Sequence, residues 1–257
     1  MNVSILEQFK LDNKKAIVVG GAGDLGKAMV EALAEAGAQV VIIDIDERMF
    51  DVCTKLKQRQ FNVEGVKADI SKIDEVQSSY KKALDILGGK LDILVNSAGI
   101  QRRYPSEQFP EEEWSKVMAI NLDATFYFCK YAANTMLQNN GGKIINVASL
   151  MSFLGGITIP AYAASKGGVG QLTKALSNDL AARGICVNAI APGYMDTQLN
   201  AAIINDKKRT DEIFVRVPMK RWGTGKDLKG LTVFLASAAS DYVSGTIIPV
   251  DGGYLGR

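Results

Sequence analysis

The sequence predicts one α/β domain, residues 1–257, built on a doubly wound parallel sheet with helices on both faces. Short and almost continuously apolar runs alternate with longer amphipathic runs, as expected for buried strands that are joined by helices. The composition is 47% hydrophobic and 23% charged, which is typical of a globular domain. No repeat or low-complexity linker divides the chain. These observations favour β-α-β units with right-handed crossovers.

Five runs rich in Val and Ile have the length of strands: Ala16–Val19, Val40–Ile43, Leu91–Val95, Ile144–Val147 and Ile185–Ile190. The alternation places a further strand just before Asp69, so that the run from Leu91 is the fourth strand. Residues 144–165 carry no charge, but Asn, Ser, Gly, Thr and Pro interrupt them. We therefore expect a buried strand, a loop and a helix start there rather than a membrane span, which needs about 20 mostly apolar residues.

Helical patterns fill the intervals between the strands. Apolar residues spaced three and four apart predict a helix over residues 25–36, and Pro110 followed by three glutamates is typical of a helix start. Residues 193–218 are the least regular part of the chain, and a long irregular segment in a compact domain is often a lid. We expect this segment to cover the substrate, and its Lys207-Lys208-Arg209 run to be a solvated face.

Composition excludes several function classes. There is no histidine, which removes Ser-His-Asp and Cys-His hydrolases, HExxH metalloproteases and the usual zinc-deaminase site, and we expect no metal. Thirty basic and 28 acidic residues give a net charge of +2, without the basic face that nucleic acid needs. Three scattered cysteines and a polar N-terminus without a signal-peptide core indicate a cytoplasmic protein with no membrane partner.

A glycine-rich turn, residues 20–26, lies between the first strand and the next helix. Glycines allow the backbone to approach a pyrophosphate, and the helix N-terminus offers free N–H groups to this anion. Asp44 ends the second strand, where a carboxylate accepts hydrogen bonds from the adenosine ribose and repels a 2′-phosphate. These features predict NAD binding. Asp69 lies after the third strand, within possible reach of the adenine.

Tyr162 and Lys166 lie four residues apart and so share one face of a predicted helix. An ammonium beside a phenol lowers the pKa of the phenol, which makes tyrosine usable as an acid–base group near neutral pH. Ser149 follows a predicted strand, where its hydroxyl is suited to orient a substrate oxygen. Asn121 lies inside a predicted helix and is expected to have a hydrogen-bonding task or to mark a kink.

These residues, in this order and spacing, resemble the short-chain dehydrogenase/reductase family from about Leu11 to Gly253. The resemblance implies a Rossmann fold with Asn121, Ser149, Tyr162 and Lys166 as the catalytic set. Tyr162 would be the general acid/base, Lys166 would bind the nicotinamide ribose, and Asn121 would hold a water in the proton path. The residues expected to contact the cofactor are Gly20, Gly23, Asp24, Leu25, Gly26, Asp44, Asp69, Ile70, Asn96, Ala98, Gly99, Tyr162, Lys166, Pro192, Gly193 and Thr197.

The glycine turn departs from the family pattern TGxxxGxG, because the spacing here is GxxGxxG. This spacing is similar to the longer, epimerase-like branch of the family, although the chain lacks the length for the substrate domain of that branch. A closer resemblance, to gluconate 5-dehydrogenases and 2-deoxy-D-gluconate 3-dehydrogenases, is carried by four segments: residues 99–103, 191–195, 221–223 and 251–255.

The resulting expectation is an NAD-dependent oxidoreductase that interconverts a secondary alcohol and a ketone on a sugar acid. Arg102 and Arg103 follow the fourth strand at the edge of the sheet where ligands bind, and a guanidinium can hold a carboxylate in two hydrogen bonds. Substrate contacts are therefore expected from Arg102, Arg103, Ser149 and Tyr162. The alternatives are a 3-oxoacyl-thioester reductase and a non-catalytic nucleotide-binding regulator. The resemblance also implies a homotetramer assembled through helices near residues 110–139 and 160–183.

Overall fold

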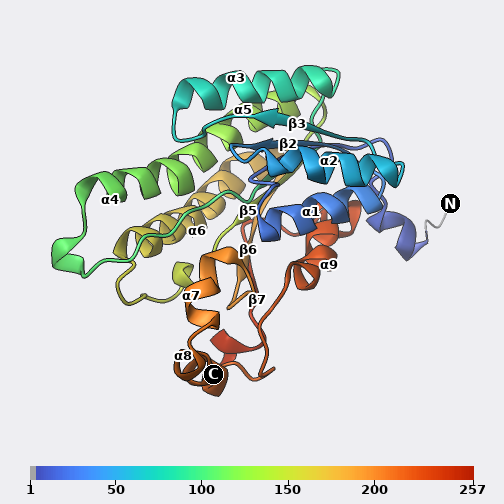
Figure 1. Ribbon diagram of the computed structural model, residues 1–257. Coiled ribbons are helices and arrows are strands. Elements are labelled where there is room, and N and C mark those ends of the chain that lie inside the picture. Colours follow the sequence, from blue (N-terminus) through green and yellow to red (C-terminus); the bar gives the residue numbers. More distant parts are fainter. Residues whose placement is uncertain (1–3) are drawn as a thin grey trace.

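Seven parallel strands form one sheet in the order β3-β2-β1-β4-β5-β6-β7 within residues 4–257, which the computed structural model describes (Figure 1). The strands are β1 Lys15–Val19, β2 Gln39–Asp44, β3 Val63–Lys67, β4 Ile93–Asn96, β5 Gly142–Val147, β6 Ile185–Pro192 and β7 Ile247–Val250. The order reverses direction between β1 and β4, where Val18 lies opposite Val95. Ligands of doubly wound folds bind at the carboxyl ends of the strands at such a point.

Helices cover both faces of the sheet (Figure 1). They are α1 Asp24–Glu35, α2 Arg48–Gln58, α3 Ile73–Ile86, α4 Glu111–Met118, α5 Ala124–Gln138, α6 Pro160–Leu180, α7 Ala201–Ile204, α8 Lys207–Arg216 and α9 Gly225–Ala236. A π-helical turn, η3 Ala119–Asp123, joins α4 to α5, and short 3₁₀ turns include η4 Leu150–Ser152 and η6 Gln198–Asn200. The predicted doubly wound fold is confirmed.

Two apolar clusters sandwich the sheet because side chains alternate along each strand. Ala16 and Val18 of β1 face one cluster, which includes residues from α1, α2 and α9. Ile17 and Val19 face the other, which includes residues from α3, α5 and the end of α6. Burial on both faces explains the unbroken apolar character that identifies these strands in the sequence.

All five strand runs identified in the sequence form strands, and the helix predicted over residues 25–36 is α1. The helix that follows Pro110 is α4, with Pro110 at its N-cap position. The uncharged stretch 144–165 forms most of β5, η4 and the start of α6, as expected. None of the helices described in residues 4–257 is long and apolar enough to cross a bilayer.

The prediction that residues 193–218 are irregular is wrong. This stretch contains η6, α7 and α8, which gather near the C-terminus at the carboxyl edge of the sheet (Figure 1). Asp206 is the N-cap residue of α8, and its side chain accepts a hydrogen bond from Arg209 N. The helix buries Ile213 in a small cluster with Val217 and Leu150. The Lys207–Arg209 run is the exposed first turn of α8, with Lys207 paired to Asp211 and Arg209 to Glu212.

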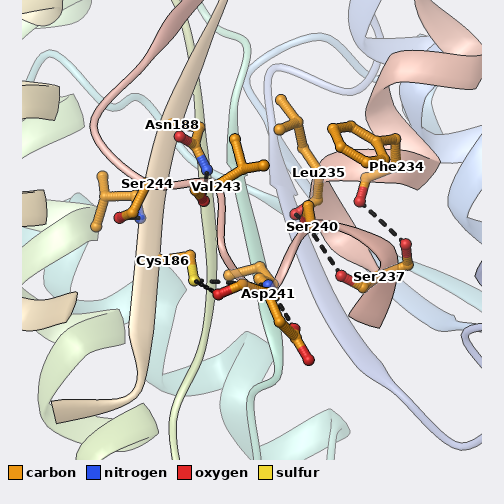
Figure 2. Close-up of polar contacts among 11 residues, drawn as sticks. Cys186, Asn188, Phe234, Leu235, Ser237, Ser240, Asp241, Val243 and Ser244 are labelled. Carbon is orange, nitrogen blue, oxygen red and sulfur yellow. Dashed lines mark hydrogen bonds and ion pairs between the residues drawn. The ribbon is translucent and has the colours of Figure 1, made fainter. Parts of the chain in front are cut away.

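Side-chain hydrogen bonds hold the last strand at the edge of the sheet (Figure 2). Asn188 of β6 donates to Val243 O (2.8 Å) and accepts from Thr246 N (3.2 Å). Ser240 Oγ donates to the carbonyls of Leu235 and Ser237 at the end of α9. These bonds fix the segment between α9 and β7. The strand β7 itself is only partly buried and contains Pro249.

Candidate active site

The glycine-rich turn packs tightly between β1 and the loop that follows β4. Gly20 has a φ of +82°, and a Cβ on it would lie 2.5 Å from Ala98 N. A Cβ on Gly26 would lie 2.0 Å from Gly20 O, so neither position accepts a side chain without movement. Gly23, the N-cap residue of α1, supplies no side-chain hydrogen bond to the helix. The turn is therefore a tightly packed backbone cradle that leads into the N-terminus of α1, which fits the diphosphate of a dinucleotide.

Asp44 is fixed beside this cradle. Its Oδ2 accepts from Ala22 N (2.8 Å) and its Oδ1 from Asp46 N (3.0 Å). The nearby cations are paired: Arg48 Nε donates to Asp46 Oδ2 (2.7 Å), and Lys67 Nζ lies 2.6 Å from Glu47 Oε1. The carboxylate is thus held beside the glycine turn although it lines neither cavity described below, so its ribose contact stays a prediction. The two nearby cations are paired with other acids.

Tyr162 and Lys166 lie on the first turns of α6, next to Ser149 at the end of β5. The Lys166 ammonium is buried, donates to Val147 O (2.6 Å) and lies 5.9 Å from the centroid of the Tyr162 ring. Ser149 Oγ accepts from Met151 N (3.2 Å) at the start of η4. The three side chains predicted to do chemistry therefore converge at the carboxyl ends of the central strands.

Burial controls the charge states of this group. It lowers the pKa of Lys166 from 10.5 to about 8, because the site disfavours an ammonium. It also raises the pKa of the Tyr162 phenol, and a hydrogen bond with Ser149 offsets part of this rise. The lowered phenol pKa that the Tyr–Lys spacing predicts is therefore not found. The reason is desolvation of the phenol by burial, and the Lys166 ammonium is directed at a backbone carbonyl.

Asn121 lies in the π-helical turn η3 and is completely buried. Its Oδ1 accepts from Ile100 N (2.8 Å), and its Nδ2 donates to Ile100 O (3.0 Å) and Ser165 Oγ (3.0 Å). Ser165 in turn donates to Tyr162 O (2.8 Å). Of the two alternatives for Asn121, the hydrogen-bonding task is therefore observed, within a π-helical turn. The task seen here is to join the loop after β4 to the turn that carries Tyr162.

Two adjoining cavities meet at Tyr162. One is lined by the glycine turn and by Lys166, Thr197 and Gln198. The other is lined by Ser149, Arg103, Pro192, Gly193, Thr197 and apolar residues from η4 and the end of β6. The first has the position expected for a dinucleotide and the second that expected for a substrate. No group of three or more potential metal ligands occurs among the described residues.

The two consecutive arginines have different environments. Arg102 Nε donates to Glu113 Oε2 of α4 (2.7 Å), and its Nη1 donates to Gln101 O (3.0 Å). Arg103 lines the substrate cavity and forms no ion pair with any described residue. Grouping both arginines as substrate contacts is therefore only half supported by the geometry, because Glu113 already engages Arg102.

Several predicted cofactor residues do not line either cavity. Asn96 is buried beneath the sheet edge, where its Nδ2 donates to Asn146 Oδ1 (2.9 Å). Ala98 packs against Gly20 and shapes the cradle from behind. Asp69 accepts from Ser71 Oγ (2.7 Å), a bond that lowers the pKa of the carboxyl, and Ile70 packs on the apolar cluster beside α3. Their adenine and nicotinamide roles stay predictions.

Other lining residues escaped sequence reasoning. The substrate cavity is also lined by Gln101, Leu150, Met151, Ile159, Tyr194, Met195 and Asn200. Gln101, Tyr194 and Met195 lie inside motifs that the sequence singles out, in the loops that follow β4 and β6. A rule that treats each residue following a parallel strand as a candidate would have found these three. Ile159 and Asn200 come from loops that only the tertiary fold brings to the site.

Known proteins are similar to this chain in sequence and in fold. The family model described as enoyl-(acyl carrier protein) reductase matches residues 20–255. The 2-dehydro-3-deoxy-D-gluconate 5-dehydrogenases of Escherichia coli and Bacillus subtilis are 44% and 43% identical to this chain, over 98% of it and 100% and 98% of their own lengths. A crystal structure of a gluconate 5-dehydrogenase from Burkholderia cenocepacia, in complex with NADP and tartrate, is 38% identical, covers 98% of this chain and 99% of its own, and has a TM-score of 0.93. The chain belongs to the short-chain dehydrogenase/reductase family and is an oxidoreductase that acts on CH–OH groups.

Proposed function

We propose that this enzyme interconverts a secondary alcohol and a ketone on a sugar acid, with NAD as the hydride carrier and Tyr162 as the proton donor and acceptor. The observation that carries the proposal is that Ser149, Tyr162 and Arg103 line one cavity, which adjoins the glycine cradle at Tyr162. The nicotinamide, when bound, accepts or supplies the hydride. The remaining chemistry belongs to the side chains of this chain.

Tyr162 is suited to exchange the hydroxyl proton because its phenol reaches both cavities. Ser149 Oγ accepts from Met151 N and its hydroxyl hydrogen-bonds Tyr162, so it is suited to orient a substrate oxygen at the same phenol. Lys166 supplies a positive charge that favours phenolate, although burial makes this ammonium easier to deprotonate than a surface lysine. The hydrogen bond with Ser149 offsets part of the cost of a buried phenolate, and the charge of Lys166 acts in the same direction.

Arg103 supports an acidic substrate. A guanidinium without a carboxylate partner in a cavity offers a planar pair of donors to a substrate carboxylate. Curated relatives carry names of gluconate and deoxygluconate dehydrogenases, and the Burkholderia relative holds tartrate, a dicarboxylate. We therefore assign carboxylate binding to Arg103 and a positioning role to Arg102, which ties the loop after β4 to α4.

NAD is proposed over NADP because of Asp44. A 2′-phosphate on the adenosine ribose would bring two like charges together, and Arg48 and Lys67 are paired to Asp46 and Glu47. The Burkholderia relative holds NADP, so family membership alone does not select the cofactor. The proposal therefore depends on the fixed position of this one carboxylate.

We also propose that the enzyme is a homotetramer and acts in the cytoplasm. Large apolar side chains remain partly exposed on the two helices before and after η3, with Trp114 and Phe126 each 41% exposed. An apolar surface on α4 and α5 supports assembly through these helices. Light scattering on a size-exclusion column should give a mass near four chains, and Phe126→Asp should lower it.

The experiment that tests this function is a set of initial rates with NAD and NADP over a panel of sugar acids and neutral polyols. At least one six-carbon sugar acid should exceed every polyol in kcat/KM. Arg103→Met should raise KM for that acid more than tenfold, a loss above about 1.4 kcal/mol, while the KM for NAD barely moves. Arg102→Met is the matched control and should have the smaller effect. Polyols that outperform every acid would refute the acidic substrate, and equal effects of the two variants would refute the assignment to Arg103.

A further inference from the structure

One carboxylate faces the region assigned to the dinucleotide. Among the described residues that line the cavity between the glycine turn and Lys166, Asp24 is the only acid. It is the first residue of α1, directly after the N-cap Gly23, and its side chain is exposed. A carboxylate is stabilised at a helix N-terminus, which is also where a diphosphate binds. The cradle therefore fits an anionic cofactor everywhere except at Asp24.

Asp24 also contacts a segment far away in the sequence. Its Oδ2 accepts from Gln198 N at 2.9 Å, across 174 positions of chain. Gln198 begins η6, whose N-cap residue Thr197 gives no side-chain hydrogen bond, so Asp24 takes the role of the missing cap. This bond connects the glycine turn to the start of the segment that continues into α7 and α8 (Figure 1).

The surrounding charges do not neutralise Asp24. Arg48 interacts electrostatically with Asp24, but its guanidinium hydrogen-bonds Asp46. Lys166 lines the same cavity but donates to Val147 O. On its outer side Asp24 shares a second polar cavity with another carboxylate, Asp196. A dinucleotide diphosphate would therefore meet a fixed negative charge that no cation of the described chain pairs.

We propose that Asp24 limits the affinity of this enzyme for its dinucleotide and speeds its release. The proposal rests on the proposed function, which places the diphosphate in this cradle. The carboxylate repels the diphosphate, and its hydrogen bond holds Gln198 and the start of the following helical segment against the glycine turn. Cofactor binding and the position of this segment are thereby coupled through one side chain.

Two variants separate the charge from the tether. Asp24→Asn keeps an oxygen that can accept from Gln198 N and removes the charge, whereas Asp24→Ala removes both. Asp51→Asn removes one exposed acid from α2 and is the matched control. The dissociation constant of NADH is measured by fluorescence titration at low and high salt, and its release rate by displacement. Amide hydrogen exchange in the cofactor-free protein reports on the Gln198 N–H.

Asp24→Asn should bind NADH about tenfold more tightly than the unmodified enzyme at low salt, with slower release, because a like-charge contact is removed. The gain should shrink in high salt, since exposed charges are screened. Asp24→Ala should lose protection of the Gln198 amide, and Asp24→Asn should keep it. Asp51→Asn should match the unmodified enzyme in every measurement.

Unchanged or weaker NADH binding by Asp24→Asn, with normal binding by the unmodified enzyme, would overturn the role in affinity and release. Equal protection of the Gln198 amide in the unmodified enzyme, Asp24→Asn and Asp24→Ala would overturn the role of the Asp24–Gln198 hydrogen bond. An unmodified enzyme that binds neither NADH nor NADPH would instead refute the proposed function from which the inference starts. The three outcomes are distinguishable because binding and exchange are measured separately.

Discussion

Replacing Lys166 by methionine should make the protein more stable at neutral pH while it destroys the proposed active site. The side chain is 4% exposed, and burial lowers its pKa from 10.5 to about 8. At about 1.4 kcal/mol per pKa unit, holding the buried ammonium costs the folded state about 3 kcal/mol near pH 7. Methionine has a similar length and no charge. Loss of the hydrogen bond to Val147 O removes about 1 kcal/mol of this gain, which leaves about 2 kcal/mol.

The size of the stability gain from Lys166→Met depends on pH. Below pH 8 the lysine is protonated in both the folded and the unfolded chain, so the full cost is present. Between pH 8 and 10.5 the folded protein has lost this proton and the unfolded chain still binds it, so the free energy of unfolding of the unmodified protein rises. The advantage of the variant should therefore be largest near pH 7 and disappear toward pH 10.

Urea unfolding at pH 7 and at pH 10 measures this difference. Lys174→Met changes an exposed lysine on the same helix and is the control, which should differ from the unmodified protein by less than about 0.5 kcal/mol at both pH values. A Lys166→Met protein that is less stable than the unmodified protein at pH 7 would refute the reasoning. The same conclusion would follow if its advantage did not change with pH.

Three further predictions test the cradle and its neighbours. Gly26→Ala should lose about 1–3 kcal/mol of unfolding free energy and most NADH binding, because its Cβ would lie 2.0 Å from Gly20 O. Gly23→Ala, with its nearest neighbour at 3.6 Å, should behave normally in denaturation. Asp44→Asn should lower the ratio of kcat/KM for NAD over NADP at least tenfold, and an unchanged ratio would contradict the proposed cofactor choice. Asn121→Ala should expose the Ile100 amide to hydrogen exchange and cost about 2–4 kcal/mol, because two backbone groups of Ile100 lose their partner.

The sheet could be predicted from the sequence wherever strands are buried on both faces. β1, β2, β4, β5 and β6 are almost continuously apolar, and their register follows from packing helices on both sides. β7 was missed because it is partly exposed, contains Pro249 and depends on Asn188 for its approach to β6. α8 was missed because its apolar residues, Ile213, Phe214 and Val215, are consecutive in the sequence rather than spaced three and four apart, and only Ile213 is buried.

The site was predictable where its geometry is local. Tyr162 and Lys166 lie close together because they are four residues apart on one helix. The glycine turn is likewise local, because β1 directly precedes it and α1 directly follows it. Other contacts depend on residues that the fold alone brings together. Glu113 distinguishes Arg102 from Arg103, and Gln198 meets Asp24 from the other end of the chain. The raised phenol pKa of Tyr162 likewise depends on burial, which residue spacing does not report.

Single-turnover hydride transfer by Tyr162→Phe tests the central claim most directly. The substitution removes one hydroxyl from a partly buried ring, so the fold and NADH binding should survive. With a sugar acid that the unmodified enzyme oxidises, the rate of NADH formation should fall by about 100-fold or more, the scale of positioned proton transfer. Near-normal hydride transfer by Tyr162→Phe, with NADH binding intact, would contradict the assignment of this tyrosine as the acid–base group.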